Sequence, residues 1–311
     1  MLGKEGNLGL LLLRHAAYAA TLLLGALLLS QILFEAVPGD PARRALGPYA
    51  SEATVSQLRT EMGLDRPLAA RMANNVLSTL TLDFGRSIVD GRSVAPEVRD
   101  KFMRTFSLGL QAVCLACAAT LGLLAVTHFF PRVGVLVYLA RAPAVLPSFL
   151  SAVLVALAAA IWMPNLFSFS VGGTGVPAPL LPSLVAAIYP GSVLVTSLAS
   201  RFSSLRGASH YRSARAYGVG RARLFRDALL VPALPGIIAL VIGQLSLVIF
   251  ASLVIEIIFS LPGTGTLLLA SIQNNDYPML QGILIINAFV FVGLHFLAET
   301  LYPVLDPRIA R

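Results

Sequence analysis

Long apolar runs separated by short polar segments dominate this chain of 311 residues. Only 12% of the residues are charged, 57% are hydrophobic, and the mean hydropathy is +0.80. Soluble domains carry about 25% charged residues, and a helix needs about 20 apolar residues to cross a bilayer. The composition therefore predicts an integral membrane protein with an all-α fold.

Six runs have the character of membrane spans, the fourth being slightly short: residues 16–36, 103–127, 142–162, 184–199, 236–258 and 278–302. The short segments between them alternate in charge. Those expected in the cytoplasm hold every Lys and Arg of the short segments, whereas the loops 163–182 and 260–277 hold none. The positive-inside rule then places both chain termini in the cytoplasm. A signal peptide would have a shorter apolar core and a small-residue cleavage site, and neither is evident.

The chain is expected to have three parts: residues 1–36 form the cytoplasmic N-terminus and the first span, residues 37–102 an extracytoplasmic segment, and residues 103–311 the transmembrane core with a cytoplasmic loop at 201–232. The middle part is polar, with nearly balanced charge, which suits a small folded layer in water. Within it, residues 51–63 predict a helix capped by Ser51 or Thr54. Pro96 is expected to begin a helix that leads into the second span.

The loop 201–232 is strongly basic. It contains one acidic residue, Asp227, and seven arginines: Arg201, Arg206, Arg212, Arg215, Arg221, Arg223 and Arg226. Residues 209–217 predict a short helix ended by Gly218, which suits a left-handed helix end. Residues 222–230 predict a second helix that stops before Pro232. The charge alone fits two interpretations, a solvated positive-inside loop and a docking helix for a soluble partner.

Catalytic and cofactor sites have little support in this sequence. The two lysines, Lys4 and Lys101, lie outside any Gly-rich phosphate loop, so a nucleotide site of that kind must belong to another subunit. The chain has no HExxH, GxSxG or acidic metal cluster, which predicts a non-enzymatic protein without a cofactor. Cys114 and Cys117 lie in an apolar run and predict packing. The arginines are expected to face cytoplasm and lipid headgroups, so no nucleic-acid partner is implied.

Polar residues within the apolar runs are candidates for the transport path. An ionised group in hydrocarbon is costly and commonly functional. Glu256, near the outer end of the fifth span, is either a pathway or gate group or an interfacial acid bonded to the nearby turn. Gln244 either bonds across helices or lines the path. Glu299 and His295, four residues apart, share a helix face and either pair together or meet a partner.

An ordered set of motifs resembles one family nearly end to end. The segments are VPGDPA (37–42), GLDRPL (63–68), LDFGRSI (82–88), GRSV (91–94), ARAYG (214–218), IEIIFSLPGTGTLLLASIQNNDYPMLQG (255–282) and LDPRI (305–309). Together they are similar to inner-membrane permeases of binding-protein-dependent ABC importers, in the dipeptide, oligopeptide and nickel branch. ARAYG resembles the core of that family's EAA loop, although Arg212 stands where the motif has an acidic residue.

The resemblance implies a type I-like importer permease with six transmembrane helices in a bacterial inner membrane. Its implied partners are a second homologous permease, two cytoplasmic ATPases that bind ATP and Mg, and an extracytoplasmic solute-binding protein. The implied ATPase-coupling residues are Tyr211, Arg212, Ala214, Arg215 and Gly218. Peptide is the favoured cargo, with nickel, metal chelates and glutathione as alternatives. A secondary transporter or channel that needs no ATP is the rival from another class.

Overall fold

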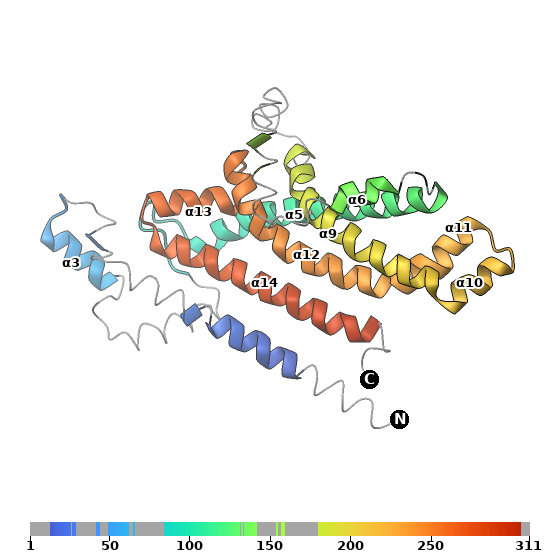
Figure 1. Cartoon of the computed structure of the whole chain (residues 1–311). Coiled ribbons are helices and arrows are strands. Elements are labelled where there is room, and N and C mark those ends of the chain that lie inside the picture. The colour runs from blue at the N-terminus through green and yellow to red at the C-terminus, as the bar shows by residue number, and fades with distance from the viewer. Residues whose placement is uncertain are drawn as a thin grey trace. The chain divides into compact units, whose positions relative to one another are not determined.

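The described part of the chain is helical apart from its turns. The computed structural model describes residues 13–25, 27–28, 42–43, 49–61, 65, 84–130, 132, 134–141, 154, 157–158 and 180–305. Within these ranges one isolated antiparallel bridge, between Arg86 and Ser93, is the sole β feature. The named elements are α3 (Glu52–Glu61), α5 (Val94–Phe129), α6 (Val135–Arg141), α9 (Leu180–Gly207), α10 (Ser209–Ala216), α11 (Arg221–Arg223), the π-helix η3 (Leu224–Leu230), α12 (Val231–Ile258), α13 (Thr264–Gln273) and α14 (Tyr277–Leu305), and Figure 1 labels all of them except η3.

Four helical stretches in the described residues are long and apolar enough to cross a membrane: Val94–Phe129, Leu180–Gly207, Arg221–Ile258 and Tyr277–Leu301. They contain the spans predicted second, fourth, fifth and sixth. Of the predicted first span, the described residues up to 28 are helical. The predicted third span lies almost wholly outside the described residues. The count of six spans and the extracytoplasmic layer therefore stay predictions.

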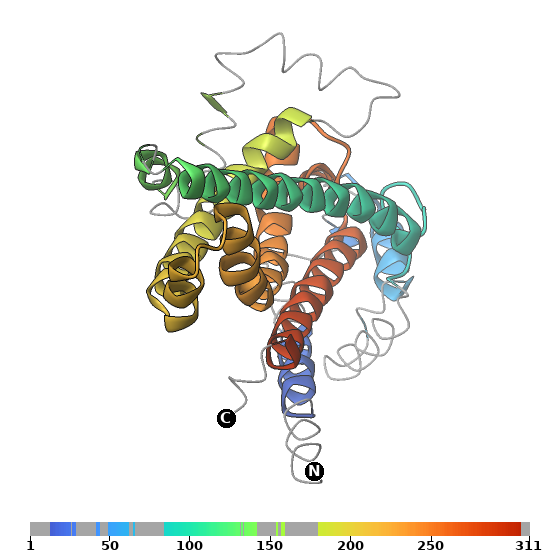
Figure 2. The ribbon, with the colours of Figure 1, turned by 90° about the vertical axis from the view of Figure 1, so that its right-hand side faces the viewer.

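The structure confirms one predicted helix start, at Ser51, and places the other, Pro96, in the first turn of its helix. The Ser51 hydroxyl oxygen accepts the backbone N–H of Thr54 at 3.2 Å, which confirms Ser51 as the N-cap of α3. Pro96 lies in the first turn of α5, where its missing N–H costs no helix bond. The same helix then continues without a break into the second span, as Figure 2 shows. The connection 260–277, which is predicted to lie outside the membrane, contains a helix of its own, α13.

The predicted stop before Pro232 is wrong, because the chain remains helical through Pro232 and Pro235 into α12. The reason lies in the preceding turn. Residues of η3 bond in the wider i→i+5 register, with the Val231 N–H donating to the Arg226 carbonyl. Pro232 falls in the first turn of α12, where a proline is tolerated. The predicted helix 222–230 is otherwise confirmed as α11 and η3.

The chain divides into two compact units, one of residues 1–104 with 262–293 and one of residues 105–261 with 294–311. In the second unit, small residues let α5, α9 and α12 approach closely. A Cβ added at Gly109 of α5 would lie 3.4 Å from Ile249 of α12, and one added at Gly191 of α9 would lie 3.7 Å from the Ala116 Cβ. Close backbone approach at small residues is the usual way in which membrane helices pack.

In the first unit, a turn and two helices form a small core. Four buried side chains, Val94, Val98, Met279 and Ile283, pack together there. Asp276, 5% exposed, precedes α14 and holds the turn at residues 87–88. Its carboxylate accepts the Ser87 hydroxyl at 2.5 Å and the backbone N–H groups of Ile88 and Met279, each at 3.4 Å. One buried acid thus joins segments that are 189 residues apart in the sequence.

We expect Asp276→Ala to loosen this turn, because it leaves the buried Ser87 hydroxyl without its acceptor. The loss should be about 1–3 kcal/mol and should speed tryptic cleavage at the exposed Arg86 and Arg92. Asp100→Ala, which removes an exposed ion pair with Arg104, is the matched control and should change little. Equal cleavage rates in the two variants would contradict the role of Asp276.

Candidate functional site

The arginine-rich loop is folded. Its predicted first helix is confirmed as α10, Ser209–Ala216. Gly218 has φ +75° and ends it, as predicted. The Gly218 N–H donates to the Arg215 carbonyl at 3.1 Å, and the Val219 N–H donates to the Ala214 carbonyl at 3.2 Å. These bonds use carbonyls that the helix end would otherwise leave free.

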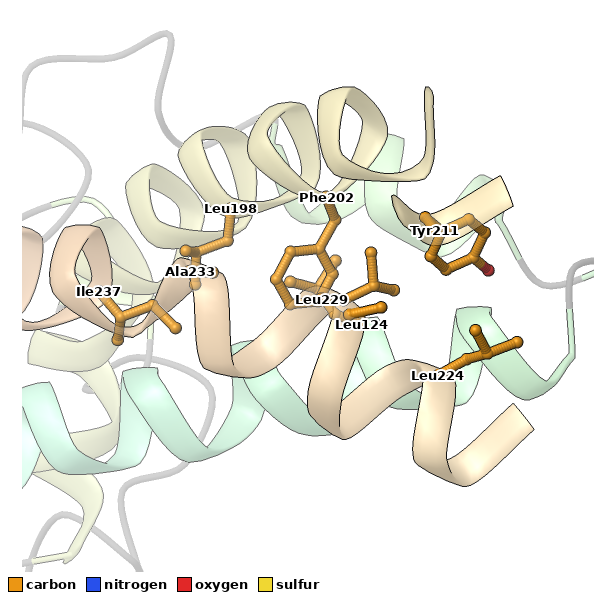
Figure 3. Close-up of a cluster of buried hydrophobic side chains, with 9 residues drawn as sticks. Leu124, Leu198, Phe202, Tyr211, Leu224, Leu229, Ala233 and Ile237 are labelled. Atoms are coloured by element: carbon orange, nitrogen blue, oxygen red, sulfur yellow. The ribbon is translucent and has the colours of Figure 1, made fainter. Parts of the chain in front are cut away.

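One face of α10 is buried against the ends of long helices. Tyr211 is 8% exposed and belongs to a buried cluster. The other members come from α5, α9, η3 and α12, and Figure 3 shows them together: Leu124, Leu198, Phe202, Leu224, Ala228, Leu229, Ala233 and Ile237. Ala214 packs against the same cluster. The short helix is therefore fixed to three of the long apolar helices through one apolar core.

Apart from Tyr211 and Ala214, the residues of α10 are exposed, and two of them are basic. Arg212 and Arg215 are exposed, as is Tyr217, at 89%. Figure 1 shows α10 and α11 together at one end of α9 and α12. Arg226 of the loop pairs with its neighbour Asp227 at 2.7 Å. Because the loop holds seven arginines and this one acid, its sequence keeps a strong positive excess.

The structure does not bring the three candidate pathway residues together. Gln244 and Glu256 are both buried in α12, at 7% and 1% exposure, but they are twelve residues apart, or about 18 Å along a helix. The Gln244 side-chain oxygen has no hydrogen-bond partner within the part of the chain that the structure describes. Glu299 lies on an exposed face of α14. Its pairing with His295 stays a prediction.

Several contacts in the second unit were not predicted from the sequence. The His295 ring nitrogen Nδ1 lies 3.3 Å from the hydroxyl of buried Ser246. His128, at the end of α5, and His210, in α10, each meet a backbone carbonyl of the loop. Isolated histidines carry no pattern that marks such contacts. In the described residues no group of three His, Cys, Asp or Glu side chains could hold a metal ion.

These features define a class: a helical membrane protein with a folded, basic helix attached to the ends of its long apolar helices. Comparison with known families is decisive. Residues 113–311 match the family model described as binding-protein-dependent transport system inner membrane component. Residues 8–109 match the model for the N-terminal part of such membrane components. The chain belongs to this family and is an ABC-transporter permease of the inner membrane.

Relatives with curated names are similar over nearly their whole length. A protein of Brucella suis biovar 1, named as a peptide transport system permease, is 29% identical over 310 residues, covering 96% of this chain and 98% of its own. A Brucella abortus protein with the corresponding name has the same identity and coverage. The glutathione transport system permease protein GsiC of Salmonella choleraesuis is 28% identical over 297 residues, covering 93% of this chain and 94% of its own.

Truncation of Tyr211 tests whether its burial anchors α10, when it is compared with truncation of an exposed tyrosine next to the same helix. Tyr211→Ala removes a buried aromatic side chain and should lower the free energy of unfolding by about 3–5 kcal/mol. Tyr217→Ala is the matched control, because that side chain is 89% exposed, and its effect should stay within about 0.5 kcal/mol. Thermal unfolding of the detergent-solubilised protein measures both. Similar losses in the two variants would contradict the anchoring role.

Proposed function

We propose that this chain is one permease subunit of an ATP-driven importer and forms half of the path for a small solute. Two cytoplasmic ATPases, a second homologous permease and an extracytoplasmic solute-binding protein complete the assembly. The chain itself binds no ATP, Mg or nucleic acid. Both termini and the loop 201–232 face the cytoplasm in this proposal. The observation that carries it is the two-faced helix α10, with Tyr211 in the core and Arg212 and Arg215 exposed.

The coupling step follows from this arrangement. A groove of the ATPase receives α10, and the exposed Gly218 permits a close approach, whereas Ala214 lets α10 pack closely on its own core. ATP-driven closure of the ATPases then displaces α10. Because Tyr211 belongs to one buried cluster with residues of α5, α9, η3 and α12, the displacement is passed through this cluster to the long helices. The membrane assembly thereby shifts between inward-open and outward-open states.

Glu256, Gln244 and Glu299 are the proposed pathway or gate residues. Glu256 is the strongest of them, because a carboxylate that is 1% exposed within an apolar helix is costly. Gln244 adds a buried amide oxygen that has no partner in the described residues. Glu299, on an exposed face of α14, is placed to meet the second permease. Each would act on solute passing between the two subunits.

Peptides are the proposed cargo, with glutathione as the nearest alternative. The names of the relatives favour these two, and glutathione is itself a peptide-like compound. Nickel and metal chelates are further alternatives within the same branch. Mass spectrometry of the ligand that co-purifies with the cognate binding protein would decide among them. Recovery of a metal chelate in place of a peptide would overturn the peptide assignment and leave the permease role intact.

Reconstitution tests the ATP-driven mechanism against the rival, a secondary transporter or channel. Proteoliposomes that contain both permeases and both ATPases should accumulate radiolabelled dialanine or glutathione when ATP and the loaded binding protein are supplied. The same vesicles without the ATPases should not. Accumulation by this permease alone, driven by an ion gradient, would refute the proposal.

Reversal of charge on α10 should weaken the grip of the ATPases. We expect the amount of ATPase that co-purifies with the double variant Arg212→Glu, Arg215→Glu to fall by about tenfold or more. Like charges that meet at an interface cost several kcal/mol. Arg86→Glu with Arg99→Glu is the matched control, because both arginines are exposed but belong to the predicted extracytoplasmic part. Loss of ATPase in this control alone would mean that the orientation is reversed.

A further inference from the structure

Two histidines contact the backbone between α10 and α12, one from the end of α5 and one from α10. The His128 Nε2 atom, at the end of α5, lies 3.2 Å from the Arg221 carbonyl oxygen. The His210 Nε2 atom, in α10, lies 3.5 Å from the Ala228 carbonyl oxygen. A carbonyl oxygen only accepts hydrogen bonds, so Nε2 must carry the hydrogen in both rings. Each imidazole therefore donates to the segment that contains α11 and η3.

His210 contacts the Ala228 carbonyl, whose usual α-helical donor, the N–H of residue 232, does not exist because that residue is a proline, Pro232. Ala228 is only 7% exposed, so water has little access to supply the missing bond. An unsatisfied buried carbonyl is unfavourable. His210 supplies a donor from α10 itself and so bonds the short helix to the base of α12.

The contact at His128 is reciprocal and is surrounded by aromatic rings. The Arg221 side-chain atom Nη1 donates to the Phe129 carbonyl at 3.3 Å, next to the end of α5. The His128 ring lies 5.4 Å from both Phe129 and Phe225, centroid to centroid. Phe225, in η3, lies 5.8 Å from Phe202 of α9. The end of α5 is thus attached to the π-helix by two polar contacts and by ring packing.

The segment held in this way is the weakest point between α10 and α12. The seven residues of η3 follow the wider π register. This register is rare in proteins, and where it occurs it is often at a functional site. Pro232 and Pro235 then remove two further backbone donors. A segment with so few α-type bonds would bend when α10 is displaced, and bending would absorb the movement before it reached α12.

We propose that His128 and His210 are positioning residues that stiffen the segment of α11 and η3, so that displacement of α10 moves α12 as a rigid body. The inference rests on the proposed coupling function of α10. It adds a requirement for two imidazole N–H groups that hold backbone carbonyls, one at Arg221 in α11 and one at Ala228 in η3. Neither histidine has to touch the ATPase or the solute for this role.

Paired substitutions separate the hydrogen bond from the ring. Gln keeps an N–H donor at the end of its side chain, and Phe keeps an aromatic ring without a donor. The test uses His128→Gln, His128→Phe, His210→Gln and His210→Phe in the complete complex with its ATPases. Ile257→Cys, at the far end of α12 and partly exposed, is the reporter, with Cys114→Ala and Cys117→Ala as background. Maleimide labelling of the reporter is compared with and without ATP and vanadate, so no cargo is needed.

In the parent complex, trapping with ATP and vanadate should change the labelling rate of the reporter. The Gln variants should keep that change, whereas the Phe variants should shift the ATP-dependent equilibrium by about two- to tenfold, the scale of one net hydrogen bond. Co-purification of the ATPases should be the same in all four, whereas the Phe variants should unfold at a slightly lower temperature, because each leaves a carbonyl without its donor. If one Phe variant fails to fold, the pair at the other histidine decides the test.

Two outcomes count against the proposals in different ways. A normal labelling response in both Phe variants, with the ATPases bound, would overturn the role of the histidines and leave the coupling function of α10 intact. Absence of bound ATPase, or of any response to ATP and vanadate, in the parent complex would overturn the coupling function and the role of the histidines with it.

Discussion

Burial of Tyr211 among the ends of three long helices is the interaction on which the rest of this structure depends. Without it, α10 would be a free basic segment in water, and its charges would have no mechanical connection to the membrane. The cluster around Phe202 and Leu229 contains no charged side chain, so its stability comes from apolar burial and depends little on salt. It therefore tolerates the ionic changes that a charged outer face must undergo when a partner binds and leaves.

The backbone between α10 and α12 follows from a conflict between two demands. Apolar side chains of η3, Leu224 and Leu229, must reach the cluster, while Pro232 prevents a regular α-helix from continuing behind them. The π register resolves the conflict by widening one stretch of helix. The cost is a set of carbonyls that lack their usual donors, and His210 supplies one donor from outside the helix. The conformation of η3 thus depends on side-chain contacts as much as on its own backbone hydrogen bonds.

Periodicity and hydropathy predicted the described long helices, α10 and the left-handed Gly218, because each depends on local chain chemistry. What they missed is tertiary. The stop before Pro232 was wrong because proline was judged by helix propensity alone, without the π register that accommodates it. Asp276 shows the same limit, since its bond to Ser87 joins residues far apart in the sequence. The candidate pathway residues stay a prediction, because the described residues do not bring Gln244 and Glu256 together.

The arginines of the loop also divide in a way that charge counting cannot show. Arg201 lies against α12, where a Cβ added at Gly236 would come within 2.7 Å of its Nη1 atom. Arg221 turns back to the Phe129 carbonyl. Arg212 and Arg215, by contrast, are exposed and lie three residues apart on α10, so they are neighbours on its surface. A positive-inside signal needs only the number of charges, whereas a docking surface needs them on one side of a fixed helix. The structure satisfies the second, stricter condition at these two positions, which is why α10 and not the loop as a whole is the proposed contact.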